Sequence, residues 1–303
     1  MLSIIIPVYN EFGNLQTLYG RLNSTLPEQV EFIFVNDGST DDSLNLIKSL
    51  ARDDDRVRYI NFSRNFGHQL AVMAGLDHCN GEAAVIIDAD LQDPPEIISE
   101  MIEKWRSGYE VVYAQRVKRK GETWWKRWTA KWFYRILKRL TDIDIPLDTG
   151  DFRLIDRKII DLLKEMPEKH KFLRGQIAWL GFNQTKITYE RDERGWGEPG
   201  YSFAKSFRLA IDGITSFSAL PLKLLTLFGF ICAIVAFLVM VYALYSKYAW
   251  EDTVPGWASL MTSVLFLGGV QMIGLGIVGE YLSRVHDNVR RRPDYVIREK
   301  NFD

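Results

Sequence analysis

Two long stretches without a charged residue constrain the fold of this chain more than any other feature. One lies between Lys223 and Lys247, and the other lies between Asp252 and Glu280. A stretch of about 23 residues forms a helix roughly 34 Å long, against a bilayer hydrocarbon core of roughly 30 Å. A buried core helix could have the same composition, but two such stretches in tandem favour a pair of membrane-spanning helices.

Basic residues flank the two stretches and predict their orientation. Lys205, Arg208 and Lys223 precede the first stretch, while Arg284 and the arginine run 290–292 follow the second. Loops rich in Lys and Arg stay on the cytoplasmic side of a membrane. We therefore expect an integral membrane protein with two spans, with both termini and the N-terminal domain in the cytoplasm and the short connection outside.

The N-terminal part of the chain alternates short stretches rich in Val and Ile with amphipathic stretches. The first kind predicts strands at residues 2–8, 30–36, 57–62, 83–88 and 110–115. The second kind predicts helices at residues 12–26, 41–52, 68–80 and about 95–107. Strand–helix alternation with nearly continuous apolar strands is typical of an α/β domain whose mostly parallel sheet is covered on both faces.

Each of the first four predicted strands ends in a polar cluster. The clusters are residues 9–11, 36–39, 63–68 and 88–93. One such cluster alone would be ordinary turn and helix-cap chemistry. In a parallel sheet, however, all four converge on the edge formed by the carboxyl ends of the strands, where α/β proteins bind their ligands. The pattern predicts a binding site at this edge, while the near-zero net charge gives no indication of nucleic-acid binding.

The cluster in IIDADLQDPPE has the side chains of a divalent metal site. Asp88, Asp90 and Gln92 offer hard oxygen ligands of the kind that Mg²⁺ or Mn²⁺ prefers. An Asp-rich turn before the helix that begins near Pro94 is the alternative. The chain has no GxGxxG motif after its first strand and no GxxxxGK[ST] motif. A bound diphosphate would therefore need a metal ion to neutralise it.

Seven motifs spread over nearly the whole chain resemble the GT-A glycosyltransferases of family 2. The motifs are SIIIPVYNE, FVNDGSTDDS, SRNFGHQLAVMAGL, IIDADLQDPPE, DTGDFRLIDR, HKFLRG and AIDGITSFSALPLK. Within that family the chain is similar to the polyprenyl-phosphate glycosyltransferases, relatives of dolichyl-phosphate mannose synthase and of bacterial undecaprenyl-phosphate glucosyltransferases. The resemblance implies a GT-A (Rossmann-like) catalytic domain at 1–200, an interfacial amphipathic helix at 201–221, two membrane helices within 222–281 and a cytoplasmic tail at 282–303.

The resemblance also implies roles for individual residues. The nucleotide pocket would include Pro7, Tyr9, Glu11, Asp37 and Asp88. The metal ion would be held by Asp88, Asp90 and Gln92. The catalytic group would consist of Asp90, Asp151 and Arg116.

Basic residues are needed for a phosphate acceptor, and the chain offers two groups of them. The acceptor phosphate would bind to Lys171, Arg174, Arg191 and Arg194. The alternative for each is an ordinary solvated surface residue. The family usually carries a lysine shortly after Arg194, but this chain reads Pro199 and Gly200 at that point, so the remaining basic residues would carry more of the acceptor binding.

The reaction implied by the resemblance is a metal-dependent, inverting transfer of a sugar to a polyprenyl phosphate such as undecaprenyl phosphate. The expected donor is UDP-glucose, and the expected place is the cytoplasmic face of a bacterial inner membrane. UDP-4-amino-4-deoxy-arabinose, UDP-N-acetylhexosamine and GDP-mannose are alternative donors. A non-catalytic, nucleotide-sugar-binding membrane scaffold is the alternative outside the enzymes. A phosphate acceptor is already ionised near neutral pH, so we expect Asp151 to orient groups rather than to remove a proton.

Two further features concern the membrane and the assembly. Residues 124–140 mix Trp with Lys and Arg, which is typical of a helix at a membrane surface and equally of a helix that packs on a domain. Five glycines between residues 268 and 279 would allow close helix packing, either between the two spans or between subunits of a homo-oligomer.

Overall fold

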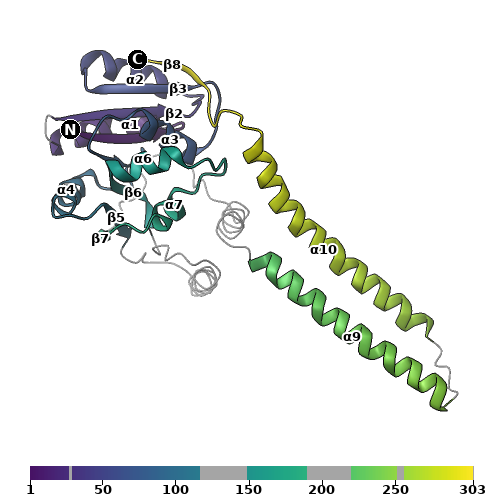
Figure 1. Cartoon of the computed structure of the whole chain (residues 1–303). Coiled ribbons are helices and arrows are strands. Elements are labelled where there is room, and N and C mark those ends of the chain that lie inside the picture. Colours follow the sequence, from purple (N-terminus) through teal and green to yellow (C-terminus); the bar gives the residue numbers. More distant parts are fainter. Residues whose placement is uncertain (27–28, 117–148, 190–219, 251–255, 303) are drawn as a thin grey trace. The chain divides into compact units, whose positions relative to one another are not determined.

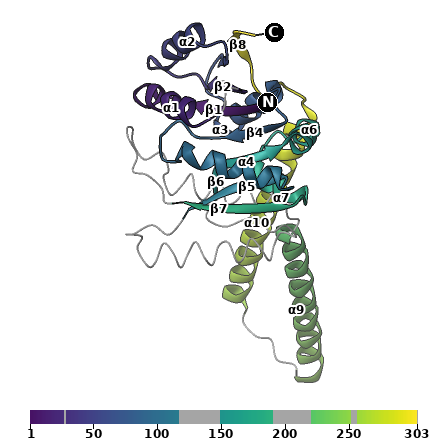
Figure 2. The same cartoon turned by 90° about the vertical axis from the view of Figure 1, so that its left-hand side faces the viewer.

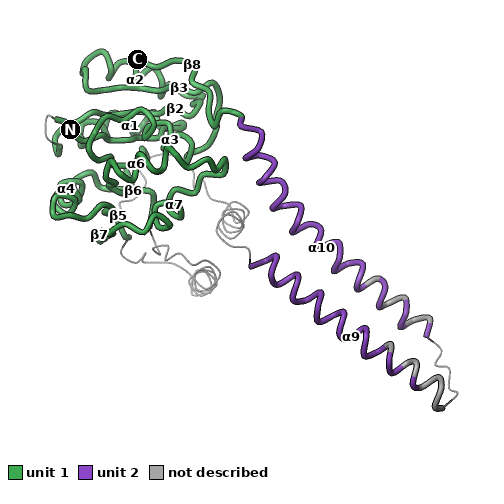
Figure 3. Tube along the Cα trace, viewed as in Figure 1, with its two compact units in different colours: residues 1–210, 292–303 green, residues 211–291 purple. Residues whose placement is uncertain are grey.

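The computed structural model describes residues 1–26, 29–116, 149–189, 220–250 and 256–302 (Figure 1). The chain separates into two compact units, Met1–Ala210 with Arg292–Asp303 and Ile211–Arg291 (Figure 3). The membrane-surface stretch 124–140 and almost all of the interfacial helix predicted at 201–221 lie outside the described residues. The domain limits expected at residues 200, 221 and 281 stay predictions.

The first unit is built on a mixed sheet with the strand order β7-β5-β6-β4-β1-β2-β3-β8. The strands are β1 (Leu2–Val8), β2 (Val30–Asn36), β3 (Val57–Phe62), β4 (Ala83–Ile86), β5 (Val111–Arg116), β6 (Thr149–Asp156), β7 (Gln184–Tyr189) and β8 (Ile297–Lys300). The predicted strands β1 to β4 pair in parallel with one another. The sequence pattern did not predict β6 and β8, which pair antiparallel with β4 and β3 respectively.

Helices cover both faces of the sheet (Figures 1 and 2). The helices of this unit are α1 (Phe12–Thr25), α2 (Ser43–Asp53), α3 (His68–His78), η1 (Pro95–Ile97), α4 (Ile98–Arg106), α6 (Arg157–Glu165) and α7 (Leu173–Trp179). Side chains of α1, α2 and α4 join one buried apolar cluster, and those of α3, α6 and α7 join another. Along β1, Ile4 and Ile6 belong to the first cluster and Ile5 belongs to the second. The central strands β1 and β4 are almost wholly apolar because both of their faces are buried, and the predicted α/β fold is confirmed.

The central helix α3 approaches β1 closely at a glycine. A Cβ atom placed on Gly75 would overlap the Cγ2 methyl of Ile5, which is itself fully buried in the sheet. Glycine at this helical position therefore allows the helix to lie against the strand. The close fit fixes the position of α3, whose first residue is His68.

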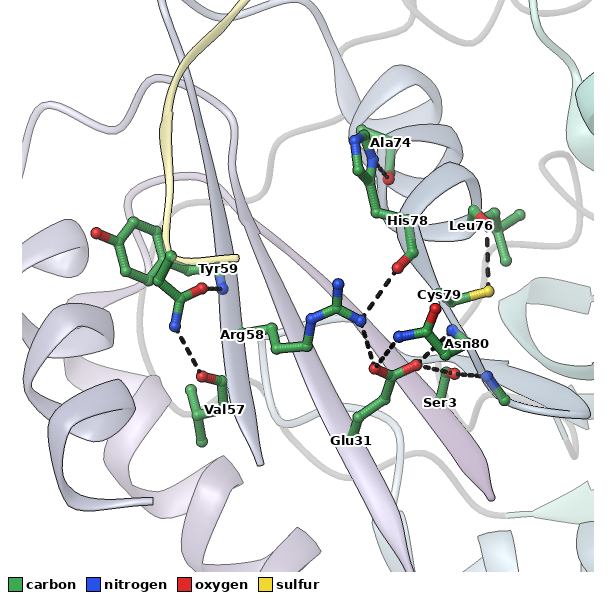
Figure 4. Close-up of polar contacts among 12 residues, drawn as sticks. Ser3, Glu31, Val57, Arg58, Tyr59, Ala74, Leu76, His78, Cys79 and Asn80 are labelled. Carbon is green, nitrogen blue, oxygen red and sulfur yellow. Dashed lines mark hydrogen bonds and ion pairs between the residues drawn. The ribbon is translucent and has the colours of Figure 1, made fainter. Parts of the chain in front are cut away.

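A polar cluster closes the amino-terminal edge of the same sheet (Figure 4). The buried carboxylate of Glu31 accepts hydrogen bonds at 2.6 Å from each of Ser3 Oγ, the backbone N–H of Asn80 and Arg58 Nη1. Burial raises the pKa of Glu31, but these three hydrogen bonds outweigh burial and hold it below its ordinary value. The cluster joins the starts of β1, β2 and β3 with the turn before β4.

The second unit consists of two long helices, α9 (Leu220–Trp250) and α10 (Trp257–Val289). Leu220–Val239 has a mean hydropathy of 2.5 and Phe266–Val289 one of 1.2, and each is long and apolar enough to cross a membrane. The two helices contact each other, and Gly274 of α10 faces the side chain of Leu225. Both predicted membrane-spanning stretches thus form helices of the required length.

We expect Gly75→Ala to destabilise the protein by about 1–3 kcal/mol, because the added methyl group overpacks the contact with Ile5. Gly20→Ala is the matched control, since a Cβ atom at this exposed position in α1 meets nothing within 4 Å. That change should stabilise the protein by up to about 1 kcal/mol through helix propensity. Thermal unfolding in detergent measures both effects, and an increase in stability for Gly75→Ala would contradict the close approach.

We expect Glu31→Gln to lower the free energy of unfolding by roughly 3 kcal/mol at pH 7, because it leaves Arg58 without its carboxylate partner. The folded-state pKa of Glu31 is lowered, so its stabilising contribution is present above the ordinary pKa of glutamate and is lost as the pH falls. Chemical denaturation of both proteins at pH 7 and pH 4 tests this. A stability difference that grows towards pH 4 would show that the sign is wrong.

Candidate functional site

The loops after β1 and β2 are joined by side-chain hydrogen bonds. Asn10 has a φ of 57°, and its Oδ1 accepts a hydrogen bond of 2.8 Å from the backbone N–H of Thr40. The N–H groups of Glu11 and Phe12 donate to Ser43 Oγ and Asp41 Oδ2. The DGSTDDS motif thus binds the start of α1, and so fixes the loop that carries the predicted nucleotide residues.

Asp37 joins the loops after β2 and β3. Its two carboxylate oxygens accept hydrogen bonds from the backbone N–H groups of Phe66, at 2.7 Å, and Gly67, at 2.9 Å. Burial raises its pKa, because the carboxylate is 3% exposed. The neighbouring Gly38 has a φ of 67°, and a Cβ atom there would lie 2.5 Å from the carbonyl carbon of Arg64. The two loops therefore fit together only with glycine at this point.

The other residues predicted for the nucleotide differ in exposure. Pro7 is buried within β1, whereas Tyr9 is 48% exposed at the strand end. The carboxylate of Glu11 accepts a hydrogen bond of 2.6 Å from Asn14 in the first turn of α1. The exposed ring of Tyr9 is available to a flat ligand such as a nucleotide base.

The predicted metal residues lie in the loop after β4. Asp88, Asp90 and Gln92 are all half-buried, and Asp90 Oδ1 accepts a hydrogen bond from the backbone N–H of Gln92. Among the described residues, no group of three or more His, Cys, Asp or Glu side chains forms a metal cage. The loop nevertheless fits Mg²⁺ or Mn²⁺ in a diphosphate complex, because such ions commonly take one or two carboxylates and complete their coordination with phosphate and water oxygens.

The antiparallel strand β6 brings Asp151 to the same edge as Asp88. Ile86 of β4 pairs with Arg153 of β6. Asp88 follows Ile86 by two residues, and Asp151 precedes Arg153 by two residues. Because the two strands are antiparallel, this register places the two carboxylates at adjoining strand ends. The pairing explains how the DADLQD and TGDFRL motifs meet.

Asp151 is the centre of a buried polar cluster. Its carboxylate accepts hydrogen bonds from Arg174 Nε at 2.8 Å and Gln69 Nε2 at 2.9 Å, and it lies 3.1 Å from His68 Nε2. Burial raises the pKa of Asp151, but Arg174 and His68 outweigh it and hold the pKa well below its usual range. The carboxylate is therefore ionised and fully engaged.

His68 connects this cluster to the loop after β4 that carries the predicted metal residues. Its Nε2 lies 3.6 Å from Asp88 Oδ1 as well as 3.1 Å from Asp151 Oδ2. Burial lowers the pKa of His68, but the charges of Asp88 and Asp151 outweigh burial and raise it to about 9. The sequence places His68 in the polar cluster after the third strand without indicating its partners, because these lie after β4 and on β6, and it does not single out Gln69.

The predicted acceptor-binding residues do not all meet at this cluster. Arg174 does, and it also donates to the carbonyl of Thr149. Lys171 instead donates a hydrogen bond of 2.7 Å to the carbonyl of Met166, and burial lowers its pKa. Arg116 is the last residue of β5, while Arg191 and Arg194 lie outside the part of the chain that the structure describes.

Comparison with solved structures finds similar folds at low sequence identity. Glucosyl-3-phosphoglycerate synthase from Mycobacterium tuberculosis, in complex with phosphoglyceric acid, is 18% identical to this chain, with a TM-score of 0.49. The alignment covers 71% of this chain and 79% of that protein.

Sequence comparison gives full-length relatives. An uncharacterized glycosyltransferase of Bacillus subtilis (strain 168), YkcC, is 50% identical over 98% of this chain and 93% of its own length. The SfII prophage-derived bactoprenol glucosyl transferase of Shigella flexneri is 39% identical over 99% of this chain and 98% of its own length. The model of the GtrB C-terminal hairpin matches residues 220–285, which cover α9 and most of α10. The model of glycosyl transferase family 2 matches residues 3–163, more than half of the chain, and the chain therefore belongs to glycosyl transferase family 2.

Proposed function

We propose that this enzyme transfers glucose from UDP-glucose to a polyprenyl phosphate at a membrane surface, with inversion at the sugar. One observation carries the proposal. His68 lies between Asp88, at 3.6 Å, and Asp151, at 3.1 Å, and Asp151 is paired with Arg174. This arrangement supports a diphosphate site beside His68 and the half-buried Arg174. Relatives named as bactoprenol glucosyl transferases, 38–39% identical over nearly their whole length, support both the sugar and the lipid acceptor.

The donor would occupy the carboxyl ends of β1, β2 and β4. The exposed ring of Tyr9 is suited to contact the base, while Asp37 fixes the loops around it. Asp88, Asp90 and Gln92 would hold Mg²⁺ or Mn²⁺. A bound divalent ion would neutralise the charge that develops on the leaving diphosphate. The chain's own contribution is to keep Asp90 oriented, through its hydrogen bond to the backbone of Gln92.

The acceptor needs cations more than it needs a base. A phosphate monoester loses its second proton near about pH 6, so it is already nucleophilic at neutral pH. Asp151 is a poor proton acceptor, because its pKa is held far below the ordinary value. Its role is to hold Arg174 and His68 in place. Arg174, His68 and the buried Arg153 together provide a positive environment for a phosphate group.

The two membrane-length helices match a lipid acceptor. A polyprenyl phosphate keeps its chain in the bilayer, so the transferase must remain at the membrane surface. Two spans with basic flanks would provide this, and the orientation predicted from those flanks places both termini in the cytoplasm, where nucleotide sugars are made. We propose the bacterial inner membrane as the location, and an oligomer that packs through the glycines of α10 remains part of the proposal.

The first test uses purified protein in detergent with undecaprenyl phosphate, Mg²⁺ or Mn²⁺, and a panel of radiolabelled nucleotide sugars. We expect label from UDP-glucose in the lipid phase. Asp90→Asn should lower the transfer rate at least about 100-fold, because the metal ion that would neutralise the diphosphate loses a protein ligand. Asp53→Asn, at an exposed position at the end of α2, is the matched control and should retain activity. Transfer from another donor alone would show that the enzyme transfers a different sugar. If no donor labelled the lipid, the lipid acceptor would be excluded.

A second test asks whether Asp151 removes a proton. We expect Asp151→Asn to lower kcat by about 10- to 100-fold through the loss of alignment, which is less than the loss in Asp90→Asn. Because the pKa of Asp151 lies well below the usual range, the acid limb of the rate profile should come from the acceptor phosphate near about pH 6. The variant should therefore keep this limb. Disappearance of the acid limb in Asp151→Asn would identify Asp151 as the base.

A further inference from the structure

A row of polar side chains crosses three adjacent strands next to the candidate donor site. Asn36 at the end of β2 pairs in register with Asn61 of β3, and Asn61 pairs with Glu299 of β8. Asn36 Nδ2 donates to Asn61 Oδ1 at 2.8 Å, and Asn61 Nδ2 donates to Glu299 Oε1 at 3.1 Å. The two asparagines are only 1% and 3% exposed. A continuous chain of hydrogen bonds therefore runs from β8 to the last residue of β2.

The row ends beside the residue that organises the donor loops. Asn36 is followed directly by Asp37, whose carboxylate binds the N–H groups of Phe66 and Gly67. The backbone N–H of Asp37 in turn donates to the carbonyl of Val8 at the end of β1. A displacement of Asn36 would therefore shift the loops after β1, β2 and β3.

The segment around β8 also holds the loop after β3 directly. The backbone N–H of Ser63 donates to the carbonyl of Val296 at 2.9 Å, and Arg298 Nη2 donates to the carbonyl of Ser63 at 3.1 Å. Ser63 begins the loop that leads to His68, which contacts both Asp88 and Asp151. Figure 1 shows β8 beside β3 at this edge of the sheet.

Further contacts bind the same segment to the first unit over its whole length. Lys169 Nζ forms an ion pair of 2.5 Å with Asp294, and Tyr295 donates a hydrogen bond of 2.7 Å to Asp77. The guanidinium of Arg58 lies 3.8 Å from the ring centroid of Phe302. We name residues 292–302 the C-terminal strap. Of the tail predicted at 282–303, the strap is thus part of the sheet unit, whereas residues 282–289 continue α10, which ends at Val289.

We propose that the C-terminal strap is a positioning element of the donor site, and that Glu299 acts through Asn61 and Asn36 to hold the nucleotide loops in their binding geometry. The inference rests on the proposed function, since it takes a uridine diphosphate as the ligand of these loops. Glu299 does not touch the donor. Its effect is on donor affinity rather than on the chemical step, because the row it anchors ends at Asn36, next to Asp37, and not at Asp151 or Arg174.

Three variants separate this role from general stabilisation. Glu299→Ala removes the acceptor for Asn61, whereas Glu299→Gln keeps an oxygen at that position and removes only the charge. Lys48→Met is the matched control, since it removes the 2.7 Å ion pair with Glu299 but leaves the hydrogen-bonded row intact. Binding of UDP with Mn²⁺ to the full chain in detergent is measured by calorimetry, and donor KM and kcat are measured alongside.

We expect Glu299→Ala to weaken UDP binding about fivefold and to raise donor KM with little change in kcat, as for the loss of one hydrogen bond that orders a binding loop. Glu299→Gln and Lys48→Met should bind UDP within about twofold of the wild type. A Glu299→Ala variant that melts earlier yet binds UDP as the wild type does would overturn the proposal. Failure of the wild type itself to bind UDP would overturn the proposed donor and this inference with it.

Hydrogen exchange of the wild-type protein provides a second measurement that needs no variant. If the strap and the donor loops are coupled, bound UDP should slow amide exchange in β8 more than in α6, which packs on the opposite face from α1 and α2. An equal slowing of amide exchange in β8 and α6 would contradict the coupling.

Discussion

The buried carboxylate of Asp151 is the interaction on which the rest of the site depends. A charge that is 7% exposed is stable only when it is paired and hydrogen-bonded. Its partners come from α3, through His68 and Gln69, and from α7, through Arg174. Two helices that are far apart in the sequence are therefore held at one strand end, and His68 extends the cluster to Asp88. The same pairing holds the pKa of Asp151 well below its usual range, which is the basis for proposing that it does not act as a base.

The position of Asp151 in turn depends on an antiparallel strand in an otherwise familiar α/β pattern. β6 lies between β4 and β5, and its register with β4 sets Asp151 opposite the start of the loop that carries Asp88 and Asp90. A parallel strand in that place would bring the other end of its sequence to the site. Strand direction thus decides which residue of β6 lies beside Asp88 at this edge of the sheet.

The sequence predicted the strands and helices that have a clear local pattern of apolar residues. β1 to β5 and α1 to α4 follow from apolar runs and helical periodicity, and the metal-binding loop stands out through Asp88 and Asp90. It did not predict β6 as a strand, because Asp151 and Arg153 put charges on a face that proves to be buried. Their burial is made possible by partners on α3 and α7, which no local pattern reveals. Lys171 stays a predicted acceptor-binding residue, and its hydrogen bond to the carbonyl of Met166 is a local contact within the same connection.

β8 is the clearest case of structure that exists only through long-range pairing. Its four residues, IREK, have no apolar alternation, and an isolated strand of this length would not be stable. It forms because β3 would otherwise present an unpaired edge, and because side chains on both sides of the strap find partners in the first unit. In sequence, the membrane helices are consequently an insertion between two parts of one folded unit.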